Sequence, residues 1–396
     1  MRHAGGRWPA SATVEQTLPG EYYTACPFFH REMERIWFNT WLCAGRAEQI
    51  PEKGDFFTRQ VGDESVVVVR GREGGIGAFY NVCRHRGSRL CTDEAGNLKS
   101  GLIRCPYHSW TYDATHGALV SAPNIPDGTE GFDKARFPLF SLRVEMWEGF
   151  IWVNFDCHAA PLRDVLGLPS TYSYYERYHA GDLKIGKLIA YDVDANWKVI
   201  MENGMECYHC SHIHPELSRC TPPMLPRQWV HQELPESKVF KHSGGGMPLA
   251  PGFEAVNLDG RPRRPRFRDL ADEDTHAIYY AFVYPHMLLG FAPDYVFFFT
   301  VWPLAVNKTK VWAYWLFDPA AMVRGDFDPS DAVEFWDITN RQDWRACELA
   351  QLGSQSRVYR TGGALVPFEW MVNQFRRYIL AEMQDGHVAR AGGGAG

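Results

Sequence analysis

Two short blocks decide the fold of the first half of this chain: NVCRHRGSRL at residues 81–90 and GLIRCPYHSWTY at residues 101–112. Together they read C-x-H, nineteen residues, then C-x-x-H, through Cys83, His85, Cys105 and His108. One cysteine and one histidine in each of two loops would let both thiolates bind one metal ion and both imidazoles another.

That donor pattern is typical of a Rieske [2Fe–2S] cluster, in which two histidines replace two cysteines on one iron and raise the reduction potential. A structural zinc site uses the same residue types, but zinc sites favour C-x₂₋₄-C spacings over C-x-H. A chance grouping is the other alternative, and Gly87, Gly101 and Pro106 argue against it because they favour two tight loops. Cys91 lies between the blocks and is expected to be a packed thiol.

Composition excludes several classes of protein. The 396 residues are 45% hydrophobic and carry a formal net charge of -6 without a long basic run, so a nucleic-acid partner is not expected. The sequence contains no run of 18 apolar residues, so no membrane span is expected. The first residues lack the apolar core of a signal peptide. The ten cysteines are therefore expected to be reduced, in the cytoplasm, where patterned Cys and His favour metal binding.

The first half of the chain has the pattern of an all-β domain, which we assign to residues 42–158. Residues 1–41 form an N-terminal segment with a helix over Glu21–Trp41, expected to pack on the second domain. Short β-branched or aromatic runs between glycine turns then predict strands at Ser65–Arg70, Gly77–Val82 and Phe150–Phe155.

Residues 159–390 mix helices with strands, which predicts an α+β domain with an antiparallel sheet. Helical periodicity marks 161–177, 196–212, 329–352 and 367–382. Strand-like runs lie between them, at Ala277–Tyr284, Tyr295–Trp302 and Lys310–Phe317. The Gly- and Pro-rich segment 235–275 is expected to be a loop over one face, and 391–396 a disordered tail.

The block NWKVIMENGMECYHCSHIHPEL at 196–217 holds a second group of candidate ligands: Glu202, Glu206, His209, His212 and His214. Oxygen-activating iron is often held by two histidines and one carboxylate, which leaves positions open for O₂ and substrate. His209 and His214 are five residues apart, but Pro215 disfavours helix at His214, so that histidine can turn back. On helical phasing alone, Glu202, Glu206 and His209 would instead form an ordinary solvated face.

The carboxylate ligand has to come from another element, and Asp343 is the candidate. A helix is predicted to begin near Asp328-Pro329-Ser330. Asp343 shares one face of it with small or apolar residues: Ala332, Trp336, Thr339, Cys347 and Ala350. An ionised Asp on an inward face needs a cation or hydrogen-bond donors. The alternative is a salt bridge to Arg341 or Arg345.

Over nearly its whole length the sequence resembles the α-subunits of Rieske aromatic-ring-hydroxylating oxygenases. CRHRG and CPYHSW match the cluster motif, ENGMECYHCSHIHPE looks like the iron-histidine motif, and NRQDWRACELAQLGSQS looks like the stretch that supplies the iron carboxylate. The resemblance implies a Rieske β-domain inserted near the N-terminus of a helix-grip catalytic domain. It implies a [2Fe–2S] cluster on Cys83, His85, Cys105 and His108, and a mononuclear Fe(II) on His209, His214 and Asp343. His212 matches no ligand.

Glu206 stands where the ring dioxygenases of this family carry Asp, and a Glu there is similar to the choline, carnitine and glycine betaine monooxygenase branch. The resemblance implies a homotrimer in which Glu206 links the partner subunit's His108 to His209. It also implies O₂-dependent hydroxylation of an N-methyl carbon in a small quaternary ammonium compound such as glycine betaine, followed by loss of formaldehyde.

Gly71–Gly77 lacks the spacing of a dinucleotide-binding fingerprint, so NAD(P)H electrons are expected through a separate flavin/iron–sulfur reductase. Three alternatives stay open at this point. The same metal centres could hydroxylate an aromatic or other apolar substrate. The chain could be a Rieske electron carrier without mononuclear iron, or a binding module stabilised by zinc.

Overall fold

The structure, a computed structural model, describes residues 13–126, 128–223, 230–231 and 234–384. The chain forms two compact units, which we call the β unit (residues 37–162) and the sheet–helix unit (residues 1–36 with 163–396). The expected tail at 391–396 lies outside the described residues. Among the residues that are described, no helix is long and apolar enough to cross a bilayer.

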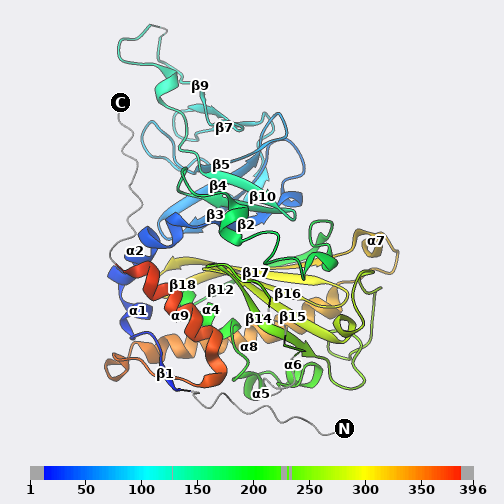
Figure 1. Ribbon diagram of the computed structural model, residues 1–396. Helices are drawn as coiled ribbons and strands as arrows, with labels where there is room; N and C mark the ends of the chain where they lie inside the picture. The colour runs from blue at the N-terminus through cyan, green and yellow to red at the C-terminus, as the bar shows by residue number, and fades with distance from the viewer. Residues whose placement is uncertain (1–12, 127, 224–229, 232–233, 385–396) are drawn as a thin grey trace. The chain divides into compact units, whose positions relative to one another are not determined.

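The strands of the β unit pair in antiparallel sheets of four, three and three (Figure 1). The sheet of four has the order β5 (Ile76–Tyr80), β4 (Glu64–Arg70), β3 (Asp55–Val61) and β6 (Ala95–Asn97). The second sheet consists of β10 (Arg143–Trp147), β11 (Phe150–Asn154) and β2 (Leu42–Arg46). The third consists of β7 (Leu102–Arg104), β8 (Thr111–Asp113) and β9 (Leu119–Ser121).

The core of the β unit explains where its two cysteine loops lie. β4 carries four consecutive valines, all buried, and β-branched side chains suit a buried pleated strand. Two of them, Val67 and Val69, share one hydrophobic cluster with Cys83, Cys105 and Trp110. The sulfur-bearing ends of both loops are therefore seated on the same core.

The sheet–helix unit is built on a seven-stranded antiparallel sheet with helices packed against it (Figure 1). The strand order is β12 (Lys184–Val193), β18 (Lys308–Phe317), β17 (Val296–Ala305), β16 (Met287–Phe291), β15 (Ala277–Val283), β14 (Phe240–Pro248) and β13 (Val230–His231). The longer helices are α2 (Cys26–Arg35), α4 (Trp197–Gly204), α8 (Ser330–Ser354) and α9 (Trp370–Met383). The short elements are β1 (Glu15–Gln16), which pairs with β19 (Ala364–Leu365), and α5 (Cys210–Ile213), α6 (Pro215–Cys220) and α7 (Pro319–Met322).

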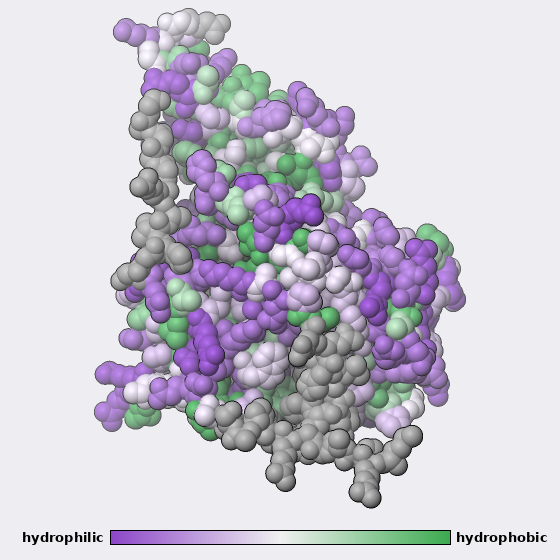
Figure 2. Space-filling model, viewed as in Figure 1, coloured by the Kyte–Doolittle hydropathy of each residue, from purple (hydrophilic) through white to green (hydrophobic). Residues whose placement is uncertain are grey.

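Apolar side chains are concentrated inside this unit. Most of β17 and β18 is buried, and α4 packs against both α8 and β17. The surface visible in Figure 2 is mainly hydrophilic, with apolar residues only in small patches. Burial of the apolar faces of the sheet and helices is the main favourable term that holds the unit together.

A buried polar network fastens the N-terminal segment to α4. The carboxylate of Glu32 accepts hydrogen bonds from Lys198 Nζ at 2.8 Å and from Trp197 Nε1 at 2.9 Å, and all three side chains are buried. Removing either charge would leave the other buried and unpaired, which is strongly destabilising. This network positions the first turn of α4, the helix that leads into the second candidate site.

Two expected helices are shorter in the structure. The one expected over Glu21–Trp41 is divided into α1 (Glu21–Thr24) and α2 (Cys26–Arg35), and Pro27 takes the first turn of α2. The pattern at 161–177 gives only α3 (Leu162–Leu166), because Gly167 follows with a φ of +75° that ends the helix. The helices expected at 329–352 and 367–382 are confirmed as α8 and α9.

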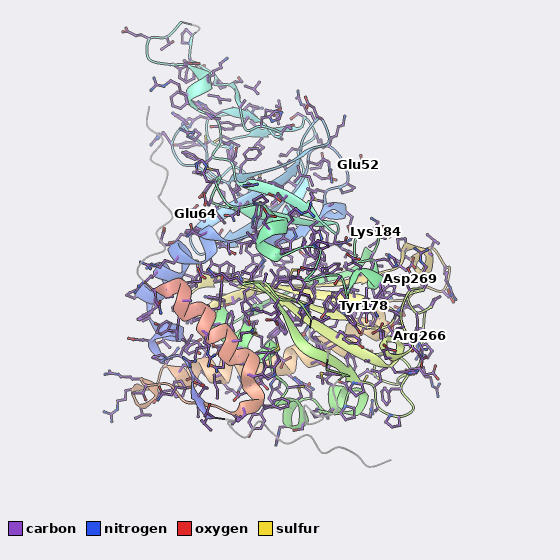
Figure 3. The ribbon with its side chains drawn as sticks, in the orientation of Figure 1. Glu52, Glu64, Tyr178, Lys184, Arg266 and Asp269 are labelled. Carbon is purple, nitrogen blue, oxygen red and sulfur yellow. A yellow bond between two sulfur atoms is a disulfide. The ribbon has the colours of Figure 1, made fainter. Side chains whose placement is uncertain are left out.

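The interpretation of 235–275 as a loop is wrong in its first part, because β14 (Phe240–Pro248) is a strand paired with β15. Glycines and a bulge between His242 and Gly246 hid it from the sequence pattern. The later part does run over one edge of the unit, where Phe267 packs edge-on against Tyr178. Figure 3 labels Tyr178 and Asp269 at this edge.

Candidate metal centres and active-site pocket

Two tight turns present the cluster candidates in the β unit. In the first, the amide of Cys83 donates to the carbonyl of Ser88 at 2.8 Å, and Gly87 has the left-handed φ of +70° that the turn requires. In the second, the amide of Cys105 donates to the carbonyl of Trp110 at 2.8 Å. This second turn connects β7 to β8, so the hairpin determines where its side chains point.

The four predicted cluster residues converge. His85 Nδ1 lies 3.2 Å from His108 Nδ1, and the thiols of Cys83 and Cys105 are within hydrogen-bond reach of each other. Both sulfurs are buried, whereas His85 is exposed and His108 is half-buried. A buried pair of sulfurs beneath a surface pair of imidazoles fits a [2Fe–2S] cluster with two cysteines on the inner iron and two histidines on the outer one.

Burial and hydrogen bonds act differently on the two sulfurs, and burial raises the pKa of Cys83. Burial acts to raise the pKa of Cys105, but the backbone N–H groups of Tyr107 and His108 outweigh it and lower that pKa. The Tyr112 hydroxyl lies 3.2 Å from Cys83 Sγ and accepts from the Arg84 amide at 3.1 Å, and it is placed to donate its proton to the sulfur once Cys83 is a thiolate. Cys91 is buried and free, as expected, and burial raises its pKa to about 11.

The second site begins where α4 ends. The helix stops at Gly204, so the sequence pattern that continued it to residue 212 is wrong, and Glu202 and Glu206 do not form one solvated helical face. His209 sits at the N-cap of the short helix α5, and His214 separates α5 from α6, which begins with Pro215. The proline ends α5 and turns His214 back towards His209, as the sequence predicted.

Asp343, on α8, is the third member of the group of candidate iron ligands. Its Oδ1 lies 2.9 Å from His214 Nε2 and 3.3 Å from His209 Nε2. Two ligands at roughly 2.1 Å from a shared metal and at right angles to each other are about 3 Å apart, so these distances fit a common metal ion. The alternative salt bridges are not formed: Arg341 pairs with Asp337, and Arg345 pairs with Glu348.

Hydrogen bonds orient both histidines. Gln342 Oε1 lies 2.8 Å from His214 Nδ1, and Glu206 Oε1 lies 2.5 Å from His209 Nδ1, so in each ring Nδ1 is the donor and Nε2 faces Asp343. Burial lowers the pKa of His209, but Asp343 and Glu206 outweigh it and raise that pKa to about 9. Burial acts to raise the pKa of Asp343, and the two histidines reverse it and keep the carboxyl ionised.

Three further residues of the motif have different surroundings. His212 is exposed, and its Nδ1 lies 3.0 Å from the Ser211 hydroxyl, which agrees with its exclusion from the ligand set. Cys207 and Cys210 form a disulfide. The expectation that all ten cysteines are reduced is therefore wrong for this pair, because the C-x-x-C spacing brings the two Cα atoms to 4.9 Å, within disulfide range.

A largely apolar pocket opens beside the second site. Glu206, His209 and Asp343 lie in its wall. Six aromatic side chains contribute to the lining: Tyr280, Phe282, Phe297, Phe299, Trp336 and Trp344. The rings of Phe297 and Trp336 are 4.2 Å apart, and Tyr280 lies 6.3 Å from Phe297 and 6.5 Å from Trp336. The sequence indicated a high aromatic content but not which rings meet here.

Two family models match the chain. The model described as "Rieske [2Fe-2S] domain" matches residues 40–138, and the one described as "Ring hydroxylating alpha subunit (catalytic domain)" matches residues 180–385. The chain therefore belongs to the Rieske non-haem iron oxygenase α-subunit family, and it is an oxidoreductase of the monooxygenase type.

Among curated relatives, the chain is similar to the glycine betaine monooxygenase oxygenase subunit of Pseudomonas aeruginosa (strain UCBPP-PA14), with 31% identity over 95% of this chain and 92% of that protein. For the corresponding subunit of Chromohalobacter salexigens the identity is 33% over 91% of this chain and 84% of that protein. The crystal structure of the quaternary ammonium Rieske monooxygenase CntA with gamma-butyrobetaine has a TM-score of 0.74 and 25% identity, covering 94% of this chain and 96% of that chain.

These matches confirm the expected fold class, a Rieske domain together with an α+β catalytic domain. The cofactors of the chain are a Rieske [2Fe–2S] cluster and a mononuclear iron, and the converging donor sets described above fit both. The curated relatives are themselves named as oxygenase subunits.

Proposed function

We propose that this chain is the terminal oxygenase of a system that removes an N-methyl group from a small quaternary ammonium compound such as glycine betaine. NAD(P)H would supply the electrons in the cytoplasm through a flavin/iron–sulfur reductase. The observation that carries the proposal is the meeting of His209, His214 and Asp343 beside an aromatic pocket whose wall includes His209 and Asp343. The relatives named for quaternary ammonium substrates support it.

In this proposal, Cys83 and Cys105 bind one iron of the cluster and His85 and His108 bind the other. Electrons leave through the side of the two imidazoles, since His85 is exposed and His108 half-buried while the sulfurs are buried. Trp110 stacks on His85, with ring centroids 4.9 Å apart and planes at 11°, and holds that ligand in place. Ligand orientation of this kind tunes the potential of a metal centre.

His209, His214 and Asp343 would hold the mononuclear iron as two histidines and one carboxylate, an arrangement that leaves positions open towards the pocket. When bound, the iron activates O₂ for insertion into a substrate C–H bond. The chain's own contribution is to position that bond and exclude water. One hydroxylated methyl group then leaves as formaldehyde, and the tertiary amine remains.

The pocket has the electrostatic character that a cation requires. Aromatic faces attract an ammonium group within about 6 Å, and Tyr280, Phe297 and Trp336 present three such rings together. The carboxylates of Glu206 and Asp343 offset the two positive charges of a bound Fe(II), so the metal end of the pocket does not repel a cation. A trimethylammonium group would therefore be drawn to the place where its methyl carbon must react.

Glu206 is proposed to connect two metal centres across a subunit boundary, with its carboxylate between His209 and the partner subunit's His108. This role requires the homotrimer implied by the family resemblance, and one structure of a related quaternary ammonium Rieske monooxygenase is described as giving insights into "inter-subunit electron transfer". Glu206→Gln should retain both metals while cluster reoxidation slows by orders of magnitude, because the amide cannot carry the charge that orients two imidazole N–H groups. Wild-type reoxidation, or a monomer in solution, would reject the role.

The test of the function is a substrate panel with the wild-type chain and a Rieske oxygenase reductase. Oxygen uptake and formaldehyde release should be coupled for glycine betaine, choline or carnitine, and absent for aromatic acids. Coupled hydroxylation of an aromatic compound alone would favour the second candidate, an apolar substrate, which the largely apolar lining also permits. Two iron atoms per chain in place of three would indicate a pure electron carrier.

A further inference from the structure

The disulfide between Cys207 and Cys210 lies at the candidate iron site. It spans Tyr208 and His209, and both cysteines contribute to the wall of the pocket. Cys210 Sγ lies 3.8 Å from His209 Nε2, the nitrogen that faces Asp343. Ligand atoms of His209, Cys210 and His214 all lie within 4.8 Å of one another. A sulfur atom is thus placed beside the group of iron ligands.

The oxidation state of this sulfur changes which metal the site prefers. A sulfur in a disulfide bears no negative charge, whereas a thiolate is a strong ligand that favours zinc over ferrous iron. In a tetrahedral zinc site, sulfur at about 2.3 Å and nitrogen at about 2.05 Å from the metal are about 3.6 Å apart. The observed 3.8 Å between Cys210 Sγ and His209 Nε2 is close to that separation.

We propose that reduction of the Cys207–Cys210 disulfide creates a zinc site composed of Cys210, His209 and His214 that overlaps the iron site. While the disulfide is intact, the Cys210 sulfur carries no negative charge and is a poor ligand, so the site keeps its selectivity for iron. This inference rests on the proposed function in one respect, namely that His209 and His214 hold the catalytic iron. Asp343 can remain as the fourth zinc ligand, since its Oδ1 already lies 2.9 Å from His214 Nε2.

Hydrogen peroxide can oxidise this cysteine pair, and a phosphine can reduce it. Two thiols give two electrons and two protons to hydrogen peroxide, and the products are the disulfide and two molecules of water. A phosphine reverses the step: the S–S bond breaks, the sulfurs gain two electrons from phosphorus and two protons from water, and the oxygen atom of that water goes to phosphorus. Zinc binding then releases the Cys210 proton.

Two single variants separate the states. In Cys207→Ser, Cys210 has no partner within the pair and stays reduced; in Cys210→Ser, the sulfur next to His209 is absent. The full-length chains, with their Rieske clusters, are exposed to equal concentrations of Fe(II) and Zn(II), with and without the phosphine, and bound metals are counted. The same chains receive Co(II), whose charge-transfer absorption reports a thiolate ligand directly. Cys26→Ser, at an exposed cysteine outside the site, is the matched control.

The phosphine should raise the zinc-to-iron ratio of the wild-type chain and of Cys26→Ser by roughly tenfold, and the cobalt–thiolate band should appear. Cys207→Ser should show the high ratio and the band without phosphine. Cys210→Ser should show neither under any condition, with an unchanged Rieske spectrum as evidence of folding. Peptide mapping should find the pair oxidised in the iron-loaded chain.

Equal cobalt bands in Cys207→Ser and Cys210→Ser, or a free pair in fully iron-loaded wild type, would overturn the inference. Either result leaves the proposed function intact provided that Cys210→Ser binds mononuclear iron. If neither wild type nor Cys210→Ser binds mononuclear iron although the Rieske spectrum is present, the iron site is refuted. The proposed function is then refuted with it.

Discussion

Gln342 should control the iron affinity of the site although it is not itself a proposed ligand. Its Oε1 accepts the Nδ1–H of His214 at 2.8 Å, and the His214 side chain is only 1% exposed. Gln342→Leu has a similar volume but no acceptor, so a buried N–H is left unsatisfied and the ring is free to take another tautomer or rotamer.

The size of the effect follows from the role of the hydrogen bond. Loss of a partner that orients a metal-bound histidine typically lowers metal affinity by about 10- to 100-fold, which corresponds to about 1.4–2.7 kcal/mol. Gln342 Nε2 also donates to Glu216 Oε2 at 3.0 Å, so the variant removes a second contact that holds α6 near α8. We therefore expect a value towards the upper end of that range.

The assay is competition for Fe(II) between the protein and a coloured chelator, under anaerobic conditions. The matched control is Arg345→Leu, on the same helix, where an exposed side chain makes only a 3.9 Å ion pair with Glu348. The control should bind iron as wild type does, and both variants should retain the Rieske spectrum. An iron affinity for Gln342→Leu equal to that of Arg345→Leu would refute the reasoning.

Three further predictions concern stability and the cluster. Tyr112→Phe removes the hydroxyl donor 3.2 Å from Cys83 Sγ and should lower the cluster's reduction potential without loss of the cluster, as potentiometric titration would show; an unchanged potential contradicts it. Lys198→Met leaves Glu32 buried and unpaired, so urea unfolding should show a loss of about 3–5 kcal/mol. Burial raises the pKa of Glu202 from 4.5 to about 7, so its ionisation weakens the fold as pH rises through this window. The melting temperature of Glu202→Gln minus that of wild type should therefore increase as the pH is raised from below 4.5 to above 7. A difference that does not change with pH would count against the raised pKa of Glu202.

The cluster motif could be predicted from the sequence because the ligands of each pair are only two or three residues apart. Cys83 and His85 occupy one tight turn, as do Cys105 and His108, so residue type and spacing together indicate the cluster. Asp343 is far from His214 in sequence, yet it could be predicted because helical phase placed one charge on an apolar face. These ligand assignments remain predictions that metal analysis of variants has to test.

The parts that could not be predicted depend on tertiary contacts. The orienting roles of Gln342, Trp110 and Tyr112 need the positions of other elements, since each side chain is ordinary for its own helix or loop. β12 and β14 escape the sequence pattern because β12 is an edge strand of mixed exposure and β14 is rich in glycine. The Cys207–Cys210 disulfide was not predicted because the expectation of a reducing compartment was applied to all ten cysteines alike.

A single-turnover experiment tests the central claim, that the site of His209, His214 and Asp343 oxidises an N-methyl group. The chain is reduced at both metal centres without reductase, mixed with O₂ and glycine betaine or choline, and assayed for formaldehyde and cluster oxidation. We predict formaldehyde in proportion to mononuclear iron in wild type, and none in Asp343→Ala, whose Rieske spectrum should persist. Cluster oxidation without formaldehyde from any quaternary ammonium compound, or equal formaldehyde from Asp343→Ala, would contradict the account.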